Sequence, residues 1–507
     1  MLRSLFRNTA ISAAAYVLVS IVGLLLVPIL IGHYGLGGYG LIVLARLFLP
    51  VAALAVLDFG YGEISTQAVA RARTDADWAR CARVLTLSLV AATAIGILAA
   101  AAFVGAARFL PGLMSVPIGD QQAFVGVLIV TGCLLPLFFV SLVAEGVIKG
   151  FEDFVTQRSI EVSASLVYAV LAATLAWKGW PFDAICYALL AATGLRAMIA
   201  SVLALRLLRS QNARMTPWNG VDRAGFFVQA RVMGASKLLG ASQTQLAPML
   251  IGVLLGPVAL GTFDALVRLP RLAKVVLGLL SSAVLPVAAR LESAGDGEGL
   301  RRLGRNGMLV VAVVTLPLLA TAMEFSRPLL LLWIGPQLAP LWLWQAAMFL
   351  VPAFGALVGF GSTALMVRPH AVAAMNRLIA FQIALQVAIS LSLFQVLQER
   401  AFILGQVLAV ALTFIAQISL VGRQLDVGRE LLGPAVRLVL VLALVAVPAS
   451  FLAPRIESWP VLAGAMTLST LVSWVLCAWV VLPAEQRRGL SRSFQTFRSR
   501  RAPLIER

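Results

Sequence analysis

The sequence predicts an all-α membrane protein with about fourteen transmembrane helices. Of its 507 residues, 61% are hydrophobic and only 12% are charged, whereas soluble proteins of this length are about 25% charged. The mean hydropathy is +0.95. Stretches of roughly 20 apolar residues, the length that crosses a bilayer core as a helix, recur along the whole chain. Helices are expected because hydrocarbon satisfies no backbone polar group.

The expected spans are the apolar runs between charged breaks. They cover residues 8–32, 41–64, 84–106, 123–147, 160–177, 184–208, 226–254, 262–289, 306–324, 340–365, 375–396, 402–421, 432–452 and 460–482. Four scattered cysteines and two histidines show no metal-binding or redox spacing, so no cofactor or metal is expected.

The basic residues predict the orientation of these spans. With the N-terminus in the cytoplasm, 27 of the 40 Lys and Arg residues fall in inside segments and 5 in outside loops. Such a bias is typical of cytoplasmic loops, so both termini are expected in the cytoplasm of a bacterium, with the protein in its inner membrane. The net charge of +18 is explained by this bias, and no nucleic-acid partner is expected.

A weak internal repeat suggests two related lobes. Pro28-Ile-Leu-Ile-Gly32 recurs as Pro248-Met-Leu-Ile-Gly252, and several arginines recur at nearly the same offset. Six spans separate the copies, so both copies have the same orientation, as in transporters built from parallel repeats. The expected parts are an N-lobe at 1–208, a cytoplasmic linker at 209–225, a C-lobe at 226–430, two added spans at 431–482, and a basic cytoplasmic tail at 483–507.

Short motifs in both halves carry a family resemblance. They are Pro28-Ile-Leu-Ile-Gly32, Gly35, Gly38-Tyr39-Gly40, Leu57-Asp58-Phe59-Gly60 and Arg71, then Leu255-Gly256, Gly261-Thr262-Phe263, Pro286, Arg290 and Trp333-Ile334-Gly335. In order and spacing they resemble the Wzx-type polysaccharide flippases of the multidrug/oligosaccharidyl-lipid/polysaccharide (MOP) exporter superfamily. Phe263 departs from the tyrosine expected there, and Gln243 and Gln245 stand where an acid or Asn would be unsurprising.

The resemblance implies a two-lobed transporter that alternates between inward-open and outward-open states. It implies a substrate in which an oligosaccharide repeat unit is linked through pyrophosphate to undecaprenol. The expected partners are this lipid-linked oligosaccharide and the bilayer, and the polysaccharide polymerase and chain-length machinery are further candidates.

Cations within the spans are the candidate substrate-binding residues. A charge at the bilayer centre costs roughly 3 kcal/mol, so such residues are expected to face a wet cavity or a partner. The candidates for a cationic cavity are Arg46, Arg196, Lys237, Arg268, Arg271 and Lys274.

One face of the expected span 262–289 is especially charged, because about 100° per residue places four of its residues within an arc of about 120°. Those four are Asp264, Arg268, Arg271 and Lys274. Asp264 and Arg268 are expected to pair at i,i+4. Arg271 and Lys274 have no acid one turn away in the sequence. They either attract the pyrophosphate or acidic sugars, or are neutralised by acids of other spans.

The acids within the spans are fewer. Asp58 and Asp264 are candidates for ion coupling, while the alternative for Asp58 is that it orders the end of its hairpin. Glu145 is four residues before Lys149, a spacing that favours a local ion pair.

Three alternative functions stay open at this point. A lipid II flippase shares the fourteen-span plan, and a drug or cation exporter of the same superfamily would want acids in its cavity. A membrane-embedded enzyme, such as a polysaccharide polymerase, a ligase or a lipid-linked glycosyltransferase, generally needs a sizeable aqueous loop. The longest expected loop here is about 209–224, so an enzyme is not expected.

Overall fold

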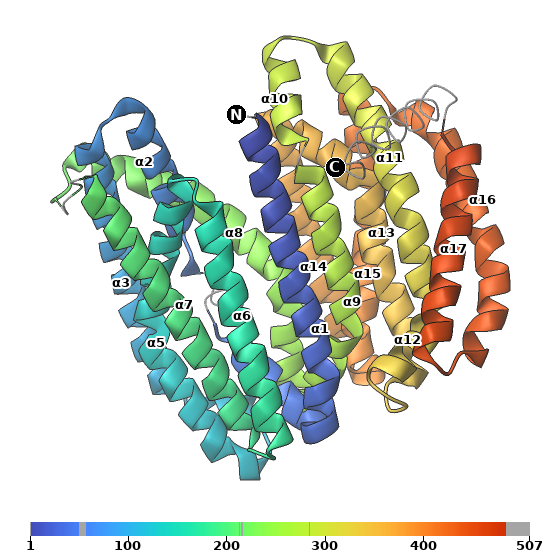
Figure 1. Ribbon diagram of the computed structural model, residues 1–507, viewed down its shortest axis with the longest axis horizontal. Helices are drawn as coiled ribbons and strands as arrows, with labels where there is room; N and C mark the ends of the chain where they lie inside the picture. Colours follow the sequence, from blue (N-terminus) through green and yellow to red (C-terminus); the bar gives the residue numbers. More distant parts are fainter. Residues whose placement is uncertain (1, 50–56, 212, 214–215, 283, 483–507) are drawn as a thin grey trace, which may run out of the picture. The chain divides into compact units, whose positions relative to one another are not determined.

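In the computed structural model, the part of the chain that is described comprises residues 2–49, 57–211, 213, 216–282 and 284–482. Helices are the regular secondary structure of these residues, and no strand occurs among them, which confirms the expected all-α class (Figure 1). The basic tail predicted at 483–507 lies outside the described residues.

The helices have the following bounds. They are α1 (Leu2–Leu47), α2 (Tyr61–Asp75), α3 (Trp78–Ala106), α4 (Leu110–Leu113), α5 (Ile118–Gly150), α6 (Phe154–Trp177), α7 (Phe182–Ser210), α8 (Gly220–Leu254), α9 (Gly256–Ser282), α10 (Leu285–Ser293), α11 (Gly297–Glu324), α12 (Ser326–Trp333), α13 (Trp342–Ala364), α14 (Pro369–Leu397), α15 (Glu399–Leu425), α16 (Gly428–Leu452) and α17 (Trp459–Val480). Three short 3₁₀ turns are η2 (Ala339–Leu341), η3 (Leu365–Val367) and η4 (Ala453–Arg455).

Eleven helices of the described part are long and apolar enough to cross a membrane. The expected spans at 226–254 and 262–289 form α8 and α9, which are not among the eleven, because polar and charged side chains interrupt their apolar sequences. The multi-pass character is therefore established, while the total of fourteen spans stays a prediction.

The expected span 41–64 is not one continuous helix. The helix that begins after a kink at Gly35 (φ 66°) ends at Leu47, and residues 58–60, just before α2 begins at Tyr61, are not helical. Gly60, with φ 81°, is in the left-handed region that favours glycine. The Asp58 carboxylate accepts the backbone N–H groups of Gly60 and Tyr61 at 3.0 and 3.2 Å, so it starts α2 as an N-terminal cap would. The prediction missed this aspartate-glycine signal inside an apolar run.

The chain divides into two compact units, residues 1–268 with 379–402, and residues 269–378 with 403–507. In the first unit, α5 packs against α2, α3 and α7, and α6 packs against α1 and α7 (Figure 1). In the second, α11 packs against α13, α16 and α17. The predicted lobes at 1–208 and 226–430, and their repeat relation, stay predictions.

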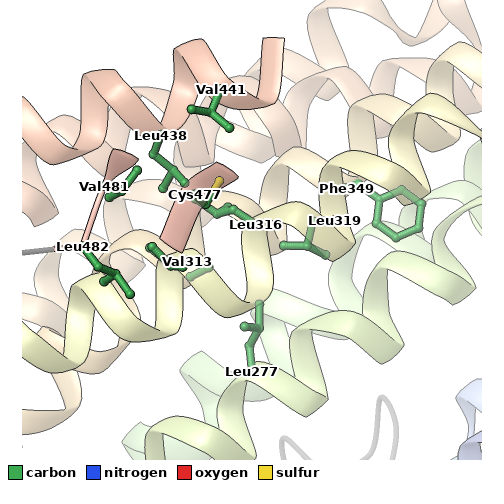
Figure 2. Close-up of a cluster of buried hydrophobic side chains, with 12 residues drawn as sticks. Leu277, Val313, Leu316, Leu319, Phe349, Leu438, Val441, Cys477, Val481 and Leu482 are labelled. Atoms are coloured by element: carbon green, nitrogen blue, oxygen red, sulfur yellow. The ribbon is translucent and has the colours of Figure 1, made fainter. Parts of the chain in front are cut away.

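The core of the second unit is an apolar cluster (Figure 2). Side chains of α9, α11, α13, α16 and α17 meet in it. Its buried members include Leu277, Val313, Leu316, Leu319, Phe349, Leu438, Val441, Cys477, Val481 and Leu482. Because these residues come from five helices, the cluster holds the added helices α16 and α17 to the rest of their unit.

Ion pairs tie the helix ends of the second unit. Arg368, just after η3, donates through Nε and Nη2 to both oxygens of Glu292, each at 2.9 Å. These hydrogen bonds lower the pKa of Glu292. Arg301 and Arg305 both donate to Glu430 at the start of α16. The loop arginines that predicted orientation therefore also hold helix ends in place.

Candidate functional site

Two glycines let α1 and α9 cross with their backbones in contact. A Cβ atom on Gly40 would lie 1.8 Å from the carbonyl oxygen of Pro257, and one on Gly261 would lie 2.4 Å from that of Leu36. Small residues permit such close approach of membrane helices. The crossing lies within the first unit and fixes which side chains of the two helices meet.

The crossing brings Tyr39 against Asp264, which is one helical turn beyond Gly261. The Tyr39 hydroxyl donates to Asp264 Oδ2 at 2.6 Å, and Arg268 Nη1 donates to the same oxygen at 2.8 Å. The nearest Arg46 nitrogen, Nη2, is 3.8 Å from Asp264 Oδ1. We call Tyr39, Arg46, Asp264 and Arg268 the Asp264 cluster. It confirms the expected pairing of Asp264 with Arg268 and holds two cations against one acid.

The two arginines of the cluster have different surroundings. Arg268 has a side chain 19% exposed, and its guanidinium also donates to the Gly23 carbonyl at 3.3 Å. Arg46 is 40% exposed, and its contact with Asp264 is longer than a hydrogen bond. Arg268 is therefore fixed in the fold, while the Arg46 guanidinium keeps its N–H groups available to an anion.

Lys237 of α8 pairs with two acids of the first hairpin. Its Nζ is 3.1 Å from Asp58 Oδ2 and 2.8 Å from Glu63 Oε1. The other Asp58 oxygen caps α2, as described above. Both oxygens of Asp58 are thus engaged in structure, which is the alternative role that the sequence left open, and its role in ion coupling stays a prediction.

Arg196 of α7 forms a two-pronged pair with Glu145 of α5. Its Nε and Nη2 donate to the two carboxylate oxygens at 2.9 and 3.0 Å. The expected local pair of Glu145 with Lys149 was wrong, because a planar guanidinium on the neighbouring helix offers two parallel hydrogen bonds where an ammonium offers a point charge. Arg196 therefore joins α5 to α7, and its role in substrate binding stays a prediction.

A further ion pair joins α3 to α8. Arg83 Nε donates to Asp222 Oδ2 at 2.6 Å, and the Asp222 side chain is only 6% exposed. Removing one partner of a buried pair leaves an uncompensated charge, which is more costly than loss of an exposed pair.

We expect Asp222→Arg to lower the free energy of unfolding by about 2–3 kcal/mol, because it places a second guanidinium against Arg83. The swap Arg83→Asp with Asp222→Arg is expected to recover most of that loss. Thermal unfolding of the purified protein in detergent measures both. Arg231→Asp, at an exposed residue of α8, is the control for the charge change. Equal midpoints for the single and the swapped variants would contradict a direct Arg83–Asp222 interaction.

The structure therefore separates the six predicted cations. Arg196, Lys237 and Arg268 are held by acids, and Arg46 is loosely held. Arg271 and Lys274 follow Arg268 on α9, in residues assigned to the second unit. Their predicted role stays open.

Sequence reasoning missed Tyr39 as the partner of Asp264. The only available signal was its position between two glycines, Gly38 and Gly40, which marks a close helix approach. A tyrosine of this kind is otherwise indistinguishable from an interfacial aromatic residue.

Comparison with known proteins identifies the family and the fold of this chain. The sequence pattern of a family described as polysaccharide biosynthesis protein matches residues 5–292. An inward-facing multidrug resistance MATE family transporter of the MOP superfamily is similar at 16% identity, with a TM-score of 0.66, covering 82% of this chain and 96% of that one. The lipid II flippase MurJ in an inward closed conformation is similar at 12% identity and TM-score 0.63, over 92% and 97% of the two chains.

A MOP superfamily transporter from Pyrococcus furiosus is similar at 15% identity and TM-score 0.61, covering 84% of this chain and 96% of that one. Identities this low show a shared fold. Sequence comparison with the curated proteins gives no significant match.

Proposed function

Because the chain belongs to the polysaccharide biosynthesis protein family, we propose that it is a flippase for undecaprenyl-pyrophosphate-linked oligosaccharide repeat units. It moves them by alternating access from the cytoplasmic to the periplasmic leaflet during surface polysaccharide biosynthesis. The family match and the MOP transporter fold support a transporter or flippase. The undecaprenyl-pyrophosphate oligosaccharide is what the family resemblance implies, and the cations of the site support an anionic headgroup.

The observation that carries the proposal is the exposed and loosely paired guanidinium of Arg46. A guanidinium in a membrane helix is costly unless it meets water or an anion. Arg46 is half exposed and only loosely paired with Asp264. A pyrophosphate that crosses the bilayer needs such a donor, because its oxygens would otherwise be unpaired in hydrocarbon. Guanidinium suits this task since it binds phosphate through two parallel hydrogen bonds.

We also propose that Arg271 and Lys274 of α9 bind the substrate's anionic groups. Outward movement of negative charge would be favoured by the membrane potential, by roughly 2.3 kcal/mol per charge at 100 mV.

We further propose that both termini are cytoplasmic, in a bacterial inner membrane, which the 27-to-5 bias of basic residues supports. Polymerase and chain-length proteins are proposed partners that would receive the product.

The Asp264 cluster favours this function over a drug or cation exporter. It offers two cations for one carboxylate, and that carboxylate already accepts from Tyr39 and Arg268. A cation would have to compete with these donors. A lipid II flippase is the alternative function, because lipid II also carries a lipid-linked pyrophosphate that cations would bind. The sugars of the transported lipid distinguish the two functions.

The test is translocation in proteoliposomes that contain a lipid-linked oligosaccharide with a lectin-binding sugar. Wild-type protein is expected to change the fraction exposed to external lectin well beyond that of empty vesicles. The variant Arg271→Gln with Lys274→Gln is expected to stay near the empty-vesicle value at equal protein content. Movement of lipid II alone would support the alternative flippase, and movement of neither lipid would refute the proposal.

A further inference from the structure

A cavity of about 150 Å³ lies between α2, α3 and α8 of the first unit, away from the Asp264 cluster. The three helices pack against one another in this region (Figure 1). One buried water needs about 10–15 Å³, so the cavity has room for a polar group of several atoms. Its inner wall includes the buried residues Ile64, Ala72, Cys81 and Phe226 together with the half-buried Gln67 and Gln229.

The rim of the cavity carries both signs of charge in equal number. Arg71 and Arg80 supply two cations, and Asp75 and Asp77 supply two acids, all exposed. No ion pair joins these four side chains to one another or to other described residues. Asp222 also lines the cavity, but its charge is already neutralised by Arg83. A ligand that matches the rim therefore carries one positive and one negative group.

The cavity lies where the chain meets the membrane surface. Asp77 caps the N-terminus of α3 by accepting the backbone N–H of Arg80 at 2.9 Å. Trp78, the first residue of that membrane-spanning helix, stacks on Phe151 with ring centroids 5.8 Å apart. Tryptophan is typical of the membrane interface. The charged rim of the cavity therefore lies at the level of the phospholipid headgroups.

We propose that this cavity binds the headgroup of a zwitterionic phospholipid with a primary ammonium group. Arg71 and Arg80 hold its phosphate, and Asp75 and Asp77 accept hydrogen bonds from its ammonium. An anionic glycerol headgroup leaves both acids without a partner, and a choline headgroup has no N–H group to donate. Bound lipid bridges α2 and α3 beside their contact with α8, so it stabilises the fold independently of transport.

Short-chain lipids added to the purified protein in detergent test the proposal through thermal unfolding. Dioctanoyl phosphatidylethanolamine is expected to raise the midpoint at concentrations about tenfold lower than the phosphatidylglycerol or phosphatidylcholine analogues. Equal effects of the three lipids would overturn the inference. Water-soluble glycerophosphoethanolamine acting as strongly as the lipid would show that the ligand is not a membrane lipid.

Matched variants locate the effect. Arg71→Gln is expected to weaken the response to the ethanolamine lipid about tenfold. The double variant Asp75→Asn with Asp77→Asn is expected to abolish the preference for it over the glycerol lipid, while asparagine keeps the cap of α3. Arg209→Gln, at an exposed arginine in the last turn of α7, is the control. An unchanged lipid preference in both test variants would place the binding elsewhere and refute the site.

Discussion

Replacing Gly40 by alanine is expected to abolish the close crossing of α1 and α9 and to lower the free energy of unfolding by about 3 kcal/mol or more. The new Cβ atom would stand 1.8 Å from the Pro257 carbonyl oxygen. That neighbour is backbone, so it cannot move aside by a rotamer change as a flexible side chain would. The helices must separate, and separation pulls Tyr39 away from Asp264.

The same segment supplies a matched control. A Cβ atom on Gly37 would lie 3.5 Å from a Val258 methyl group, which is ordinary contact. Gly37→Ala is therefore expected to be neutral, or stabilising by about 0.5–1 kcal/mol through the helical preference of alanine. Thermal unfolding in detergent, with protein yield from membranes, measures both variants. Similar midpoints for the two alanine variants would contradict the backbone contact at Gly40.

Arg46→Gln is expected to reduce lipid-linked oligosaccharide translocation by about ten- to a hundredfold, with little change in stability. The transport loss corresponds to charge-assisted hydrogen bonds of about 1.5–3 kcal/mol to the substrate phosphate. The stability change is expected to be small, because a half-exposed pair at 3.8 Å is worth at most about 1 kcal/mol.

Two further variants separate binding from structure. Arg46→Lys is expected to retain partial transport, since an ammonium preserves the charge but not the paired hydrogen bonds. Arg437→Gln removes an exposed cation from α16 and is expected to leave transport unchanged. Translocation rates in proteoliposomes, at matched protein content, measure all three variants. Wild-type rates in Arg46→Gln would remove this residue from the substrate path.

The sequence alone determined the class of this protein and its chemistry in outline. Apolar stretches of membrane length admit only helices, because each must satisfy its own backbone in hydrocarbon. Cations within such stretches mark functional or paired positions, because their cost demands a partner. The pairing of Asp264 with Arg268 was predictable from the sequence, because residues four apart lie on one face of a helix.

Only the tertiary structure decided which charges have partners. Glu145 meets Arg196 51 residues away, and Lys237 meets Asp58 179 residues away. Such contacts depend on which helices are neighbours, which one-dimensional periodicity does not contain. The break before Tyr61 was also hidden, because Asp58 and Gly60 interrupt an apolar run without changing its hydropathy much. The difference between the fixed Arg268 and the available Arg46 also depends on tertiary structure. It results from the close crossing of α1 and α9, which Gly40 and Gly261 permit.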